Sequence, residues 1–494
     1  MSKLPNHGAR YKGVEAVPPT KRDMLQFVET PRDMPDKRDS TARRDDFLEI
    51  YGDYIDAKAQ EQASRCSQCG VPFCQNHCPL QNDIPDWLRL TAEGRLKEAW
   101  EVSDATNNMP EICGRICPQD RLCEGSCVIE QSGHGTVTIG AVERFLTDTA
   151  WDEGWIKPLR VRRERPLSVG IIGSGPAGLT VAEQLRIQGW QVTVYDRHDR
   201  AGGLLIYGIP NFKLDKSIVQ RRVKRLEDGG VKFVLNTDIG TDISFDRLRE
   251  EHDAVMIATG VYKARDLDVP GAGACGVTPA LDFLIDSNRR GLGDALQTPT
   301  AEGKNVVVVG GGDTAMDCVR TAVRQGAESV TCLYRRDHAN MPGSRRETAN
   351  AQEEGVVFEW LASPKAIHDV DGQAAMIRSD RMKLGPKGPD GRQSPQAVEG
   401  GDFDRPADLV IKALGFTPEP MGDLSADLTV TRWGTLRVNP VTFETNLEGV
   451  YAAGDIVRGA SLVVWAIREG RDASVAVHKY LKGRLAAELK VAAE

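Results

Sequence analysis

The pattern of hydrophobic and polar positions changes near residue 160. Before it, apolar side chains recur at helical spacing, as at Ile84, Trp87 and Leu88, over about residues 46–150. After it, short apolar runs of strand length end in glycines and are followed by helix-compatible stretches. The pattern therefore predicts a helical N-terminal domain followed by domains that contain parallel sheets.

The second part of the chain contains two similar strand–helix–strand units. The first extends from Leu167–Ile172 to Gln191–Tyr195, and the second from Asn305–Val309 to Ser329–Tyr334. Such units predict two Rossmann-like dinucleotide-binding domains and an α/β fold class. A stretch rich in glycine and proline at 384–401 is predicted to be a loop.

Composition and the lengths of the apolar runs limit the possible partners and the expected compartment of the protein. The 494 residues carry 63 basic and 71 acidic side chains, a net charge of −8, which argues against nucleic acid or an anionic membrane as the main partner. The N-terminus has no apolar stretch of secretory length and no run is long enough to span a bilayer, so we expect a cytoplasmic protein. Residues 1–45 are polar and rich in charge and proline, and are interpreted as an extended arm, the alternative being a disordered terminus.

The first strand–helix–strand unit carries a dinucleotide fingerprint. Its strand leads into Gly-Ser-Gly-Pro-Ala-Gly at 173–178, and an acid ends the second strand 18 residues after Gly178. The glycines allow a tight turn, close approach of a pyrophosphate and close helix packing, and the acid accepts hydrogen bonds from a ribose. The predicted contacts are Gly173, Gly175, Pro176, Ala177, Gly178 and Asp196.

Three further motifs resemble the two-dinucleotide-binding flavoprotein family. They are Ala-Gly-Gly at 201–203, Ala-Thr-Gly at 258–260, and a Gly-Asp pair at 454–455 that precedes a helix-like segment. In that family such a Gly-Asp pair contacts the FAD ribityl chain, and the following helix approaches the flavin ring. The resemblance implies that the first site holds FAD, with the further contacts Gly203, Thr259, Gly260, Gly454 and Asp455.

The second unit carries a related fingerprint with a different ending. Gly-Gly-Gly-Asp-Thr-Ala at 310–315 joins strand to helix, and the second strand ends in two arginines in place of an acid. Arginine binds a 2′-phosphate by charge-assisted hydrogen bonds, so the pair predicts NADPH, the alternative being a solvated turn. Because hydride passes between the cofactors, no catalytic residue is predicted. The predicted contacts are Gly310, Gly312, Asp313, Thr314, Ala315, Arg335 and Arg336.

The helical region contains most of the cysteine. Eight of the 11 cysteines lie between residues 66 and 127, in the runs C-x2-C-x4-C-x3-C-P and C-x3-C-P-x4-C-x3-C. The first run resembles that of bacterial ferredoxins. Disulfides are disfavoured in a cytoplasmic protein, and zinc, which prefers two close pairs, is the weaker alternative. The pattern predicts two [4Fe–4S] clusters.

Longer strings resemble one family over essentially the whole chain. RCSQCGVPFCQNHCP, NNMPEICGRICPQDRLCEGSC, GGGDTAMDCVRTAVRQGA and YRRDHANMPGSRRE are similar to the small (beta) subunit of bacterial NADPH-dependent glutamate synthase. The resemblance implies an electron-entry subunit with FAD, NADPH and two [4Fe–4S] clusters, and a large partner subunit with FMN and amidotransferase chemistry that makes glutamate from glutamine and 2-oxoglutarate. The alternatives are a related NADPH:ferredoxin-type oxidoreductase subunit, the flavin subunit of a pyrimidine reductase, or a cluster-bearing scaffold or redox sensor.

A second resemblance assigns the cluster ligands. The cysteine layout is similar to that of dihydropyrimidine dehydrogenase, whose second cluster has one non-cysteine ligand. It places one cluster on Cys66, Cys69, Cys74 and Cys127, and the other on Cys78, Cys117, Cys123 and either Glu143, which we favour, or Cys113. The expected domains are the arm at 1–45, the cluster domain at 46–150, the FAD domain at 160–290 and 415–494, and the NADPH domain at 291–414.

Overall fold

The computed structural model describes residues 23–296, 298–388, 391, 393–420, 422 and 427–491. The chain divides into two compact units. Unit 1 contains Met1–Lys37 and Tyr51–Lys157, and unit 2 contains Arg38–Ile50 and Pro158–Glu494. Residues 1–22 of the predicted arm lie outside the described residues, and the rest of the arm is divided between the two units.

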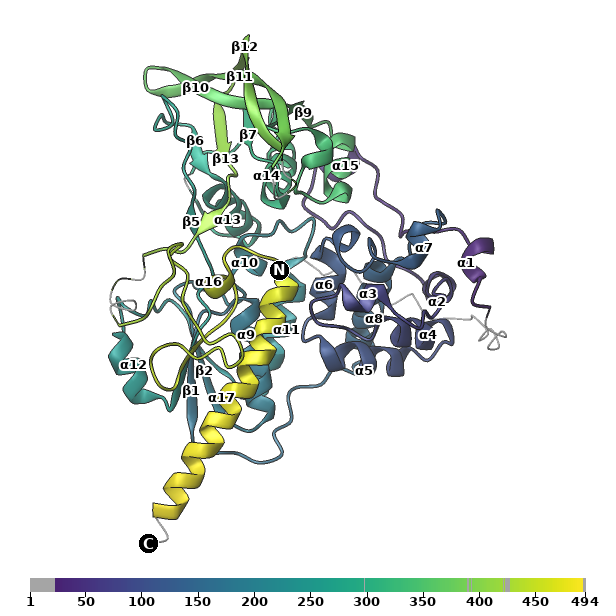
Figure 1. The fold of residues 1–494 in the computed structure, drawn as a ribbon, viewed down its shortest axis with the longest axis vertical. Helices are drawn as coiled ribbons and strands as arrows, with labels where there is room; N and C mark the ends of the chain where they lie inside the picture. Colours follow the sequence, from purple (N-terminus) through teal and green to yellow (C-terminus); the bar gives the residue numbers. More distant parts are fainter. Residues whose placement is uncertain are drawn as a thin grey trace. The chain divides into compact units, whose positions relative to one another are not determined.

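Unit 1 is helical, as the sequence pattern predicts (Figure 1). Its elements are α1 (Gln26–Glu29), α2 (Asp56–Ser64), α3 (Phe73–Asn76), α4 (Ile84–Ala92), α5 (Leu96–Thr106), α6 (Pro110–Ile116), η2 (Gln119–Arg121), α7 (Val128–Gln131) and α8 (Ile139–Asp152). The longest of them, α8, packs on α6 and contacts α2, α4 and α5. Fully buried Trp87 lies in the core of this unit, and its indole nitrogen donates to Asn82 at 3.1 Å.

The described start of the arm is bound to unit 1 as far as Lys37. The buried Arg65 guanidinium donates to the Thr30 carbonyl oxygen at 2.9 Å, and the Tyr54 hydroxyl donates to the Asp33 carbonyl oxygen at 2.5 Å. Side chains of the helical region therefore hold the arm in place. The arm depends on these contacts, because it has no core of its own.

The first sheet of unit 2 has five parallel strands and includes chain from both ends of the unit. The strands are β1 (Ser168–Ile172), β2 (Gln191–Tyr195), β3 (Lys232–Val234), β4 (Ala254–Ile257) and β15 (Val450–Ala452). They lie in the order β15-β4-β1-β2-β3. Helix α9 (Pro176–Ile187) joins β1 to β2, and the long C-terminal α17 (Val463–Val491) packs on α9 (Figure 1).

The second sheet of unit 2 also has five parallel strands. They are β6 (Val277–Pro279), β7 (Asn305–Val309), β8 (Ser329–Tyr334), β9 (Val357–Trp360) and β13 (Leu409–Lys412), in the order β6-β13-β7-β8-β9. Helix α14 (Asp313–Arg324) joins β7 to β8. Because β6 pairs with β13, this sheet begins before the expected domain boundary at 291.

An antiparallel sheet projects from the second domain. It consists of β10 (Ala362–Val370), β11 (Gln373–Lys387) and β12 (Gln393–Pro406). The prediction of a loop at 384–401 is therefore wrong for most of that stretch. Register shifts between Asp380 and Met382 and between Leu384 and Lys387 accommodate the glycines and prolines in the paired strands.

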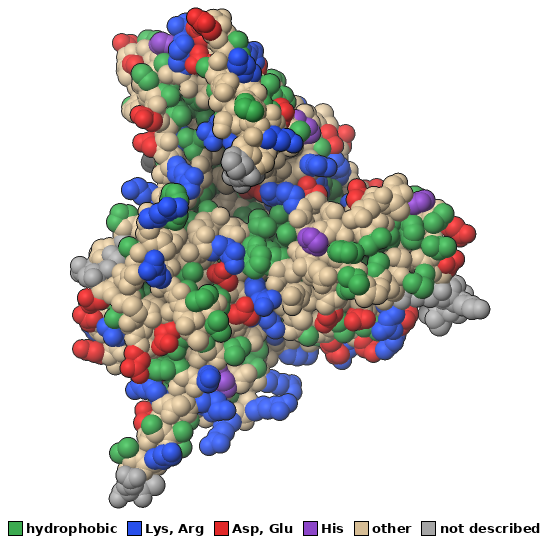
Figure 2. All heavy atoms as spheres, in the orientation of Figure 1, with side chains coloured by type: hydrophobic (Ala, Val, Ile, Leu, Met, Phe, Trp, Pro, Cys, Tyr) green, Lys and Arg blue, Asp and Glu red, His purple; other side chains and the backbone are tan. Residues whose placement is uncertain are grey.

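The remaining elements of unit 2 are short connections and helices that cover the sheets. They are η1 (Ala42–Arg44), α10 (Leu204–Tyr207), α11 (Lys216–Asp228), α12 (Phe245–Glu251), β5 (Lys263–Ala264), α13 (Ala280–Gly291), η3 (His338–Asn340), α15 (Arg345–Glu353), β14 (Phe416–Thr417) and α16 (Asp455–Arg458). No helix in the described ranges is long and apolar enough to cross a membrane. Figure 2 shows acidic and basic side chains interspersed over most of the visible face.

Candidate functional site

The turn between β1 and α9 contains the first fingerprint. A Cβ on Gly178 would stand 2.0 Å from the Gly173 carbonyl oxygen, so only glycine lets the helix begin this close to the strand. A Cβ on Gly175, in contrast, would meet no atom within 4 Å. The turn therefore leaves open space in front of the first amides of α9, where a pyrophosphate can bind.

Asp196 lies at the end of β2 and faces this turn. Its Oδ2 accepts from the Ser174 backbone N–H at 2.8 Å, and its Oδ1 accepts from the His198 backbone N–H at 2.9 Å. Thr259 and Gly260 line the same pocket as Asp196, and the Thr259 hydroxyl is buried with no hydrogen-bond partner among the described residues. A ligand with hydroxyl or phosphate oxygens would satisfy this group, as FAD would.

The C-terminal Gly-Asp motif lies against the same turn. Gly454 has a φ of 81°, and a Cβ on it would stand 2.9 Å from the Ala177 Cβ. A Cβ on Gly203 would likewise stand 2.8 Å from the Gly175 Cα. Burial raises the pKa of Asp455 to about 6. The structure therefore gathers the residues predicted for FAD around one turn, and their close approach fits a dinucleotide.

The turn between β7 and α14 repeats this geometry. A Cβ on Gly310 would lie 2.3 Å from the Ala413 carbonyl oxygen, and one on Gly311 would lie 2.4 Å from the Tyr334 ring. A Cβ on Gly312 would meet no atom within 4 Å. The second turn thus has open space at the same position as the first.

A loop that the sequence analysis missed is fixed to the second turn. The Gly343 backbone N–H donates to the Gly311 carbonyl oxygen at 2.9 Å, and the Ser344 backbone N–H donates to the Asp313 carboxylate at 2.8 Å. Asp313 opens α14 and is followed by Thr314 and Ala315. The loop therefore holds the side chain that begins the predicted NADPH helix.

The two arginines predicted to bind the 2′-phosphate are not equivalent. Arg335 is exposed just after β8. Arg336 is half-buried, and its Nε donates to the Gln393 carbonyl oxygen at 3.1 Å. A guanidinium has five N–H donors, so Arg336 keeps others for a phosphate. Arg335 has the greater freedom to turn towards a bound nucleotide.

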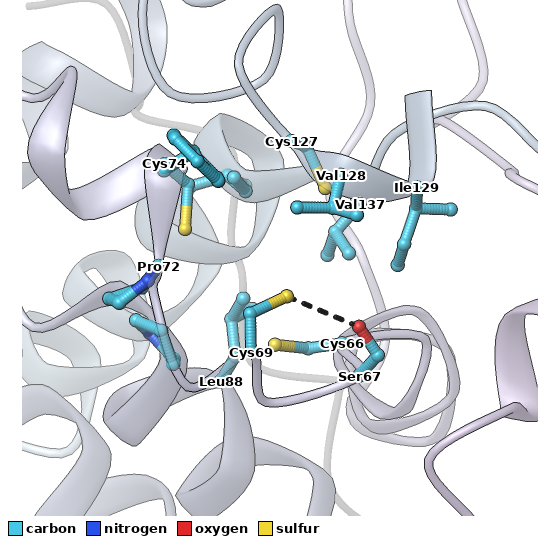
Figure 3. A pocket seen from close by; sticks show the side chains of 13 residues that line it. Cys66, Ser67, Cys69, Pro72, Cys74, Leu88, Cys127, Val128, Ile129 and Val137 are labelled. Carbon is cyan, nitrogen blue, oxygen red and sulfur yellow. Dashed lines mark hydrogen bonds between the residues drawn. The ribbon is translucent and has the colours of Figure 1, made fainter. Parts of the chain in front are cut away.

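Four cysteines of unit 1 line one largely apolar cavity (Figure 3). They are Cys66, Cys69, Cys74 and Cys127, the set predicted for one cluster. Gln68, between the first two, has a φ of 52°, and this left-handed conformation makes the sharp turn that brings both thiols to the cavity. Four thiols around an apolar space fit an iron–sulfur cluster.

The other four cysteines surround a buried carboxyl group. Burial raises the pKa of Cys78 to about 11, and the neighbouring Glu143 and Cys113 add to the shift. A hydrogen bond with Cys113 raises the pKa of Cys117, and burial raises that of Cys123, with Cys78 and Glu143 nearby. The set is therefore gathered in one place. Among the described residues, no three His, Cys, Asp or Glu side chains converge to hold a single metal ion.

Asn107 distinguishes Glu143 from Cys113. Its Oδ1 accepts from the Met109 backbone N–H at 3.0 Å, which fixes the orientation of the amide. Its Nδ2 donates to Glu143 Oε1 at 3.1 Å, and Asn82 donates to the same oxygen at 3.2 Å. Burial raises the pKa of Glu143 to about 8, and the Asn107 bond opposes the rise. The Cys113 thiol instead donates to Asn107 Oδ1 at 3.8 Å.

Comparison with known proteins identifies the family of this chain. A model described as dihydropyrimidine dehydrogenase domain II, 4Fe-4S cluster, matches residues 43–155, and one described as pyridine nucleotide-disulphide oxidoreductase matches residues 167–470. The glutamate synthase (NADPH) small chain of Azospirillum brasilense is 60% identical over 95% of this chain and 99% of its own. That of Escherichia coli K12 is 43% identical over 93% and 99%. The chain belongs to the glutamate synthase small-chain family.

Two further proteins are similar to this chain, one in sequence and one in fold. The putative oxidoreductase AegA of Escherichia coli K12 is 46% identical over 94% of this chain and 72% of its own length. The structure of Mycobacterium tuberculosis FprA aligns with a TM-score of 0.56 over 66% of this chain and 86% of FprA, at 21% identity, which shows the fold alone. The predicted fold class, an iron–sulfur domain followed by a two-dinucleotide-binding flavoprotein, is confirmed, and so is the oxidoreductase class.

Several residues that support these sites in the small chain were missed by the sequence analysis. Ser174, Asn82, Asn107 and the loop at Gly343 and Ser344 act through hydrogen bonds to predicted residues. Ser174 stands between two fingerprint glycines, and Asn107 and the loop lie in the long strings that carry the family resemblance. These positions are the only sequence signal for Ser174, Asn107 and the loop, and Asn82 has none.

Alanine at two glycines of the first turn should separate FAD binding from folding. Gly175→Ala is expected to weaken FAD binding about tenfold or more. The new methyl fills the open space that a pyrophosphate would occupy, and the resulting clash costs about 1–3 kcal/mol. Gly178→Ala is expected to lower the stability of the FAD-free protein as well, since its methyl meets the Gly173 carbonyl. Flavin content and thermal unfolding of the stripped proteins measure both. Unchanged flavin affinity in Gly175→Ala would contradict the site.

Proposed function

We propose that this small chain is the electron-input subunit of an NADPH-dependent glutamate synthase in the cytoplasm. It oxidises NADPH at the β7–α14 turn, reduces FAD at the β1–α9 turn and passes electrons singly through two [4Fe–4S] clusters. The acceptor is a large subunit that carries FMN and amidotransferase chemistry. That subunit forms glutamate from glutamine and 2-oxoglutarate.

One observation carries this proposal. Unit 2 has two nucleotide turns, and unit 1 has two groups of cysteines. Each turn has one glycine, Gly175 or Gly312, that faces open space. A flavin accepts two electrons as hydride and can release them one at a time. A chain that binds both nucleotides and iron–sulfur clusters can therefore take two electrons from NADPH and pass them on singly. The 60% identity to a named small chain over 95% of the sequence supports the choice of glutamate synthase.

The side chains of unit 2 bind and orient the two cofactors, which themselves supply the hydride chemistry. The amides at the start of α9 and α14 meet the pyrophosphates. Asp196 accepts hydrogen bonds from the FAD ribose in addition to those from Ser174 and His198. Arg335 and Arg336 take the 2′-phosphate of NADPH. The N-terminus of α17 favours negative charge on a nearby flavin by about 1 kcal/mol.

The cysteines of unit 1 divide into two ligand sets. The first set is that of the shared cavity (Figure 3). In the second set we propose Glu143 as the fourth ligand in preference to Cys113. Two amide donors converge on Glu143 Oε1, whereas Oε2 bonds to no described residue and is available to iron. The Cys113 thiol is instead engaged with the Asn107 amide oxygen.

A second candidate function follows from a specific comparison. AegA, a putative oxidoreductase, is 46% identical over 94% of this chain. The same electron-input module can therefore serve a different acceptor, as in an NADPH:ferredoxin-type oxidoreductase or a pyrimidine reductase.

Reconstitution with the large subunit tests the proposal. NADPH oxidation should become dependent on both glutamine and 2-oxoglutarate when the large subunit is added, with two glutamates formed per NADPH by the balance of the reaction. The small chain alone should reduce an artificial one-electron acceptor and form no glutamate. NADPH oxidation that stays independent of glutamine in the complex would favour the other acceptors.

Alanine substitutions at the paired arginines should lower the preference for NADPH. Loss of a charge-assisted hydrogen bond costs roughly 1.5–3 kcal/mol, so Arg335→Ala is expected to reduce the NADPH/NADH ratio of kcat/KM by about tenfold or more. Arg336→Ala should have a smaller effect, because one of its donors already bonds to Gln393. Steady-state kinetics with both nicotinamides measure the ratio, and an unchanged ratio in the double variant would contradict the assignment.

Iron analysis should identify the fourth ligand of the second cluster. Cys113→Ala is expected to retain about eight iron atoms per chain, and Glu143→Ala about four. Iron and sulfide assays on anaerobically purified protein measure both. The reverse result, with iron lost in Cys113→Ala and retained in Glu143→Ala, would assign the position to Cys113.

A further inference from the structure

Residues 38–50, which we call the strap, are part of unit 2 although the residues on either side belong to unit 1. The Arg38 backbone N–H donates to the Ile50 carbonyl oxygen at 2.9 Å, which closes the strap at its base. Just after this base, the Asp39 carboxylate accepts from the Thr41 backbone N–H at 2.9 Å, before the 3₁₀ turn η1. The strap is therefore a folded loop and not a free linker.

The η1 turn directs Arg43 into the second nucleotide domain. Arg43 is 1% exposed, and its guanidinium lies 3.0 Å from Glu354 Oε1 and 2.6 Å from Glu353 Oε2, at the end of α15. Glu354 is fully buried and also binds Arg320 at 2.8 Å and Arg324 at 2.7 Å. Both of these arginines are on α14, so three cations from two segments meet at one carboxylate.

The second half of the strap contacts the FAD-type domain. The Asn211 amide donates to the Phe47 carbonyl oxygen at 3.0 Å, and Glu49 accepts from the Asp215 backbone N–H at 3.0 Å. The Phe47 ring lies 6.2 Å from the Phe212 ring. These partners occupy the connection between α10 and α11, close in sequence to Gly203 of the FAD site.

The same connection contacts α14 directly. The guanidinium carbons of Arg320 and Arg324 lie 4.5 Å and 4.0 Å from the centre of the Phe212 ring. The Lys213 ammonium lies 2.7 Å from the Asp317 carboxylate. The strap, the 211–215 connection and α14 thus form one contact region that joins the two nucleotide domains.

We propose that the strap is a staple that sets the orientation of the NADPH domain on the FAD domain, with Arg43 as a positioning residue for hydride transfer. The inference rests on the proposed function. Helix α14 begins at the turn that would hold the NADPH pyrophosphate, so a shift of this helix moves the nicotinamide relative to the flavin. A misplacement of about 1 Å can cost about a hundredfold in rate.

The contacts around Glu354 predict that Arg43 can be replaced without loss of the fold. Without it, Glu354 still binds Arg320 and Arg324, and Lys213 still pairs with Asp317. The buried carboxylates therefore keep cationic partners. What is lost is the attachment of the strap at Arg43, and with it one constraint on α14.

The test measures flavin reduction in the full-length holoprotein after anaerobic rapid mixing with NADPH. Arg43→Met is expected to slow flavin reduction at saturating NADPH by about tenfold or more. FAD content, iron content and NADP⁺ affinity should stay unchanged, and Arg43→Lys should restore part of the rate. Arg44→Met is the matched control, because Arg44 is the next residue of η1, is exposed and makes no ion pair with a described residue.

The possible outcomes separate the staple from its alternatives. A wild-type rate of flavin reduction in Arg43→Met overturns it, and so does a rate that falls only in proportion to lost FAD or lost NADP⁺ affinity. If Arg43→Met does not fold, Phe47→Ala, which loosens the other half of the strap, is judged by the same criteria. Failure of the unaltered protein to reduce its flavin with NADPH would contradict the proposed function itself.

Discussion

The close approach of a helix to a strand at two glycine turns is the constraint on which unit 2 depends. At each turn the backbone leaves no room for a side chain at one glycine, and leaves an empty space at another, as Gly178 and Gly175 illustrate. The first property fixes the helix on its sheet, and the second creates a place for a phosphate. Folding and cofactor binding therefore impose the same requirement on the sequence.

Buried charge connects these turns to the rest of unit 2. Arg320 and Lys213 hold the pKa of Glu347 down to about 2 although burial would raise it. A carboxyl group with a lowered pKa stabilises the fold above its ordinary pKa of 4.5, and this contribution is lost as the pH falls towards 2. Such groups are costly to bury without partners, so the network specifies one arrangement of α14, α15 and the 211–215 connection. The strap adds Arg43 to that arrangement.

The sequence predicted the features that follow from local pattern. Glycine spacing located both nucleotide turns, and cysteine spacing located three of the four cysteines that line one cavity. The fourth, Cys127, was assigned by the resemblance to dihydropyrimidine dehydrogenase. The sequence did not predict β6 in the second sheet, the strands at 384–401, or the attachment of Arg43 to Glu354. Val277 of β6 and Val410 of β13 are 133 residues apart in sequence, and Arg43 and Glu354 are 311 apart, so no local period records either contact. The strands at 384–401 pair over short separations, but the glycines and prolines within them favour a loop in any reading of local pattern. The role of Asn107 likewise depends on the fold, which brings Glu143 to its amide nitrogen and Cys113 to its amide oxygen.

The central claim is that one chain converts hydride from NADPH into single electrons. It is tested most directly by anaerobic mixing of the purified small chain with NADPH, followed by a one-electron acceptor. The account predicts that NADPH removes the visible absorbance of the oxidised flavin and that the acceptor restores it, with two acceptor molecules reduced per NADPH. A flavin absorbance that NADPH leaves unchanged would contradict the account.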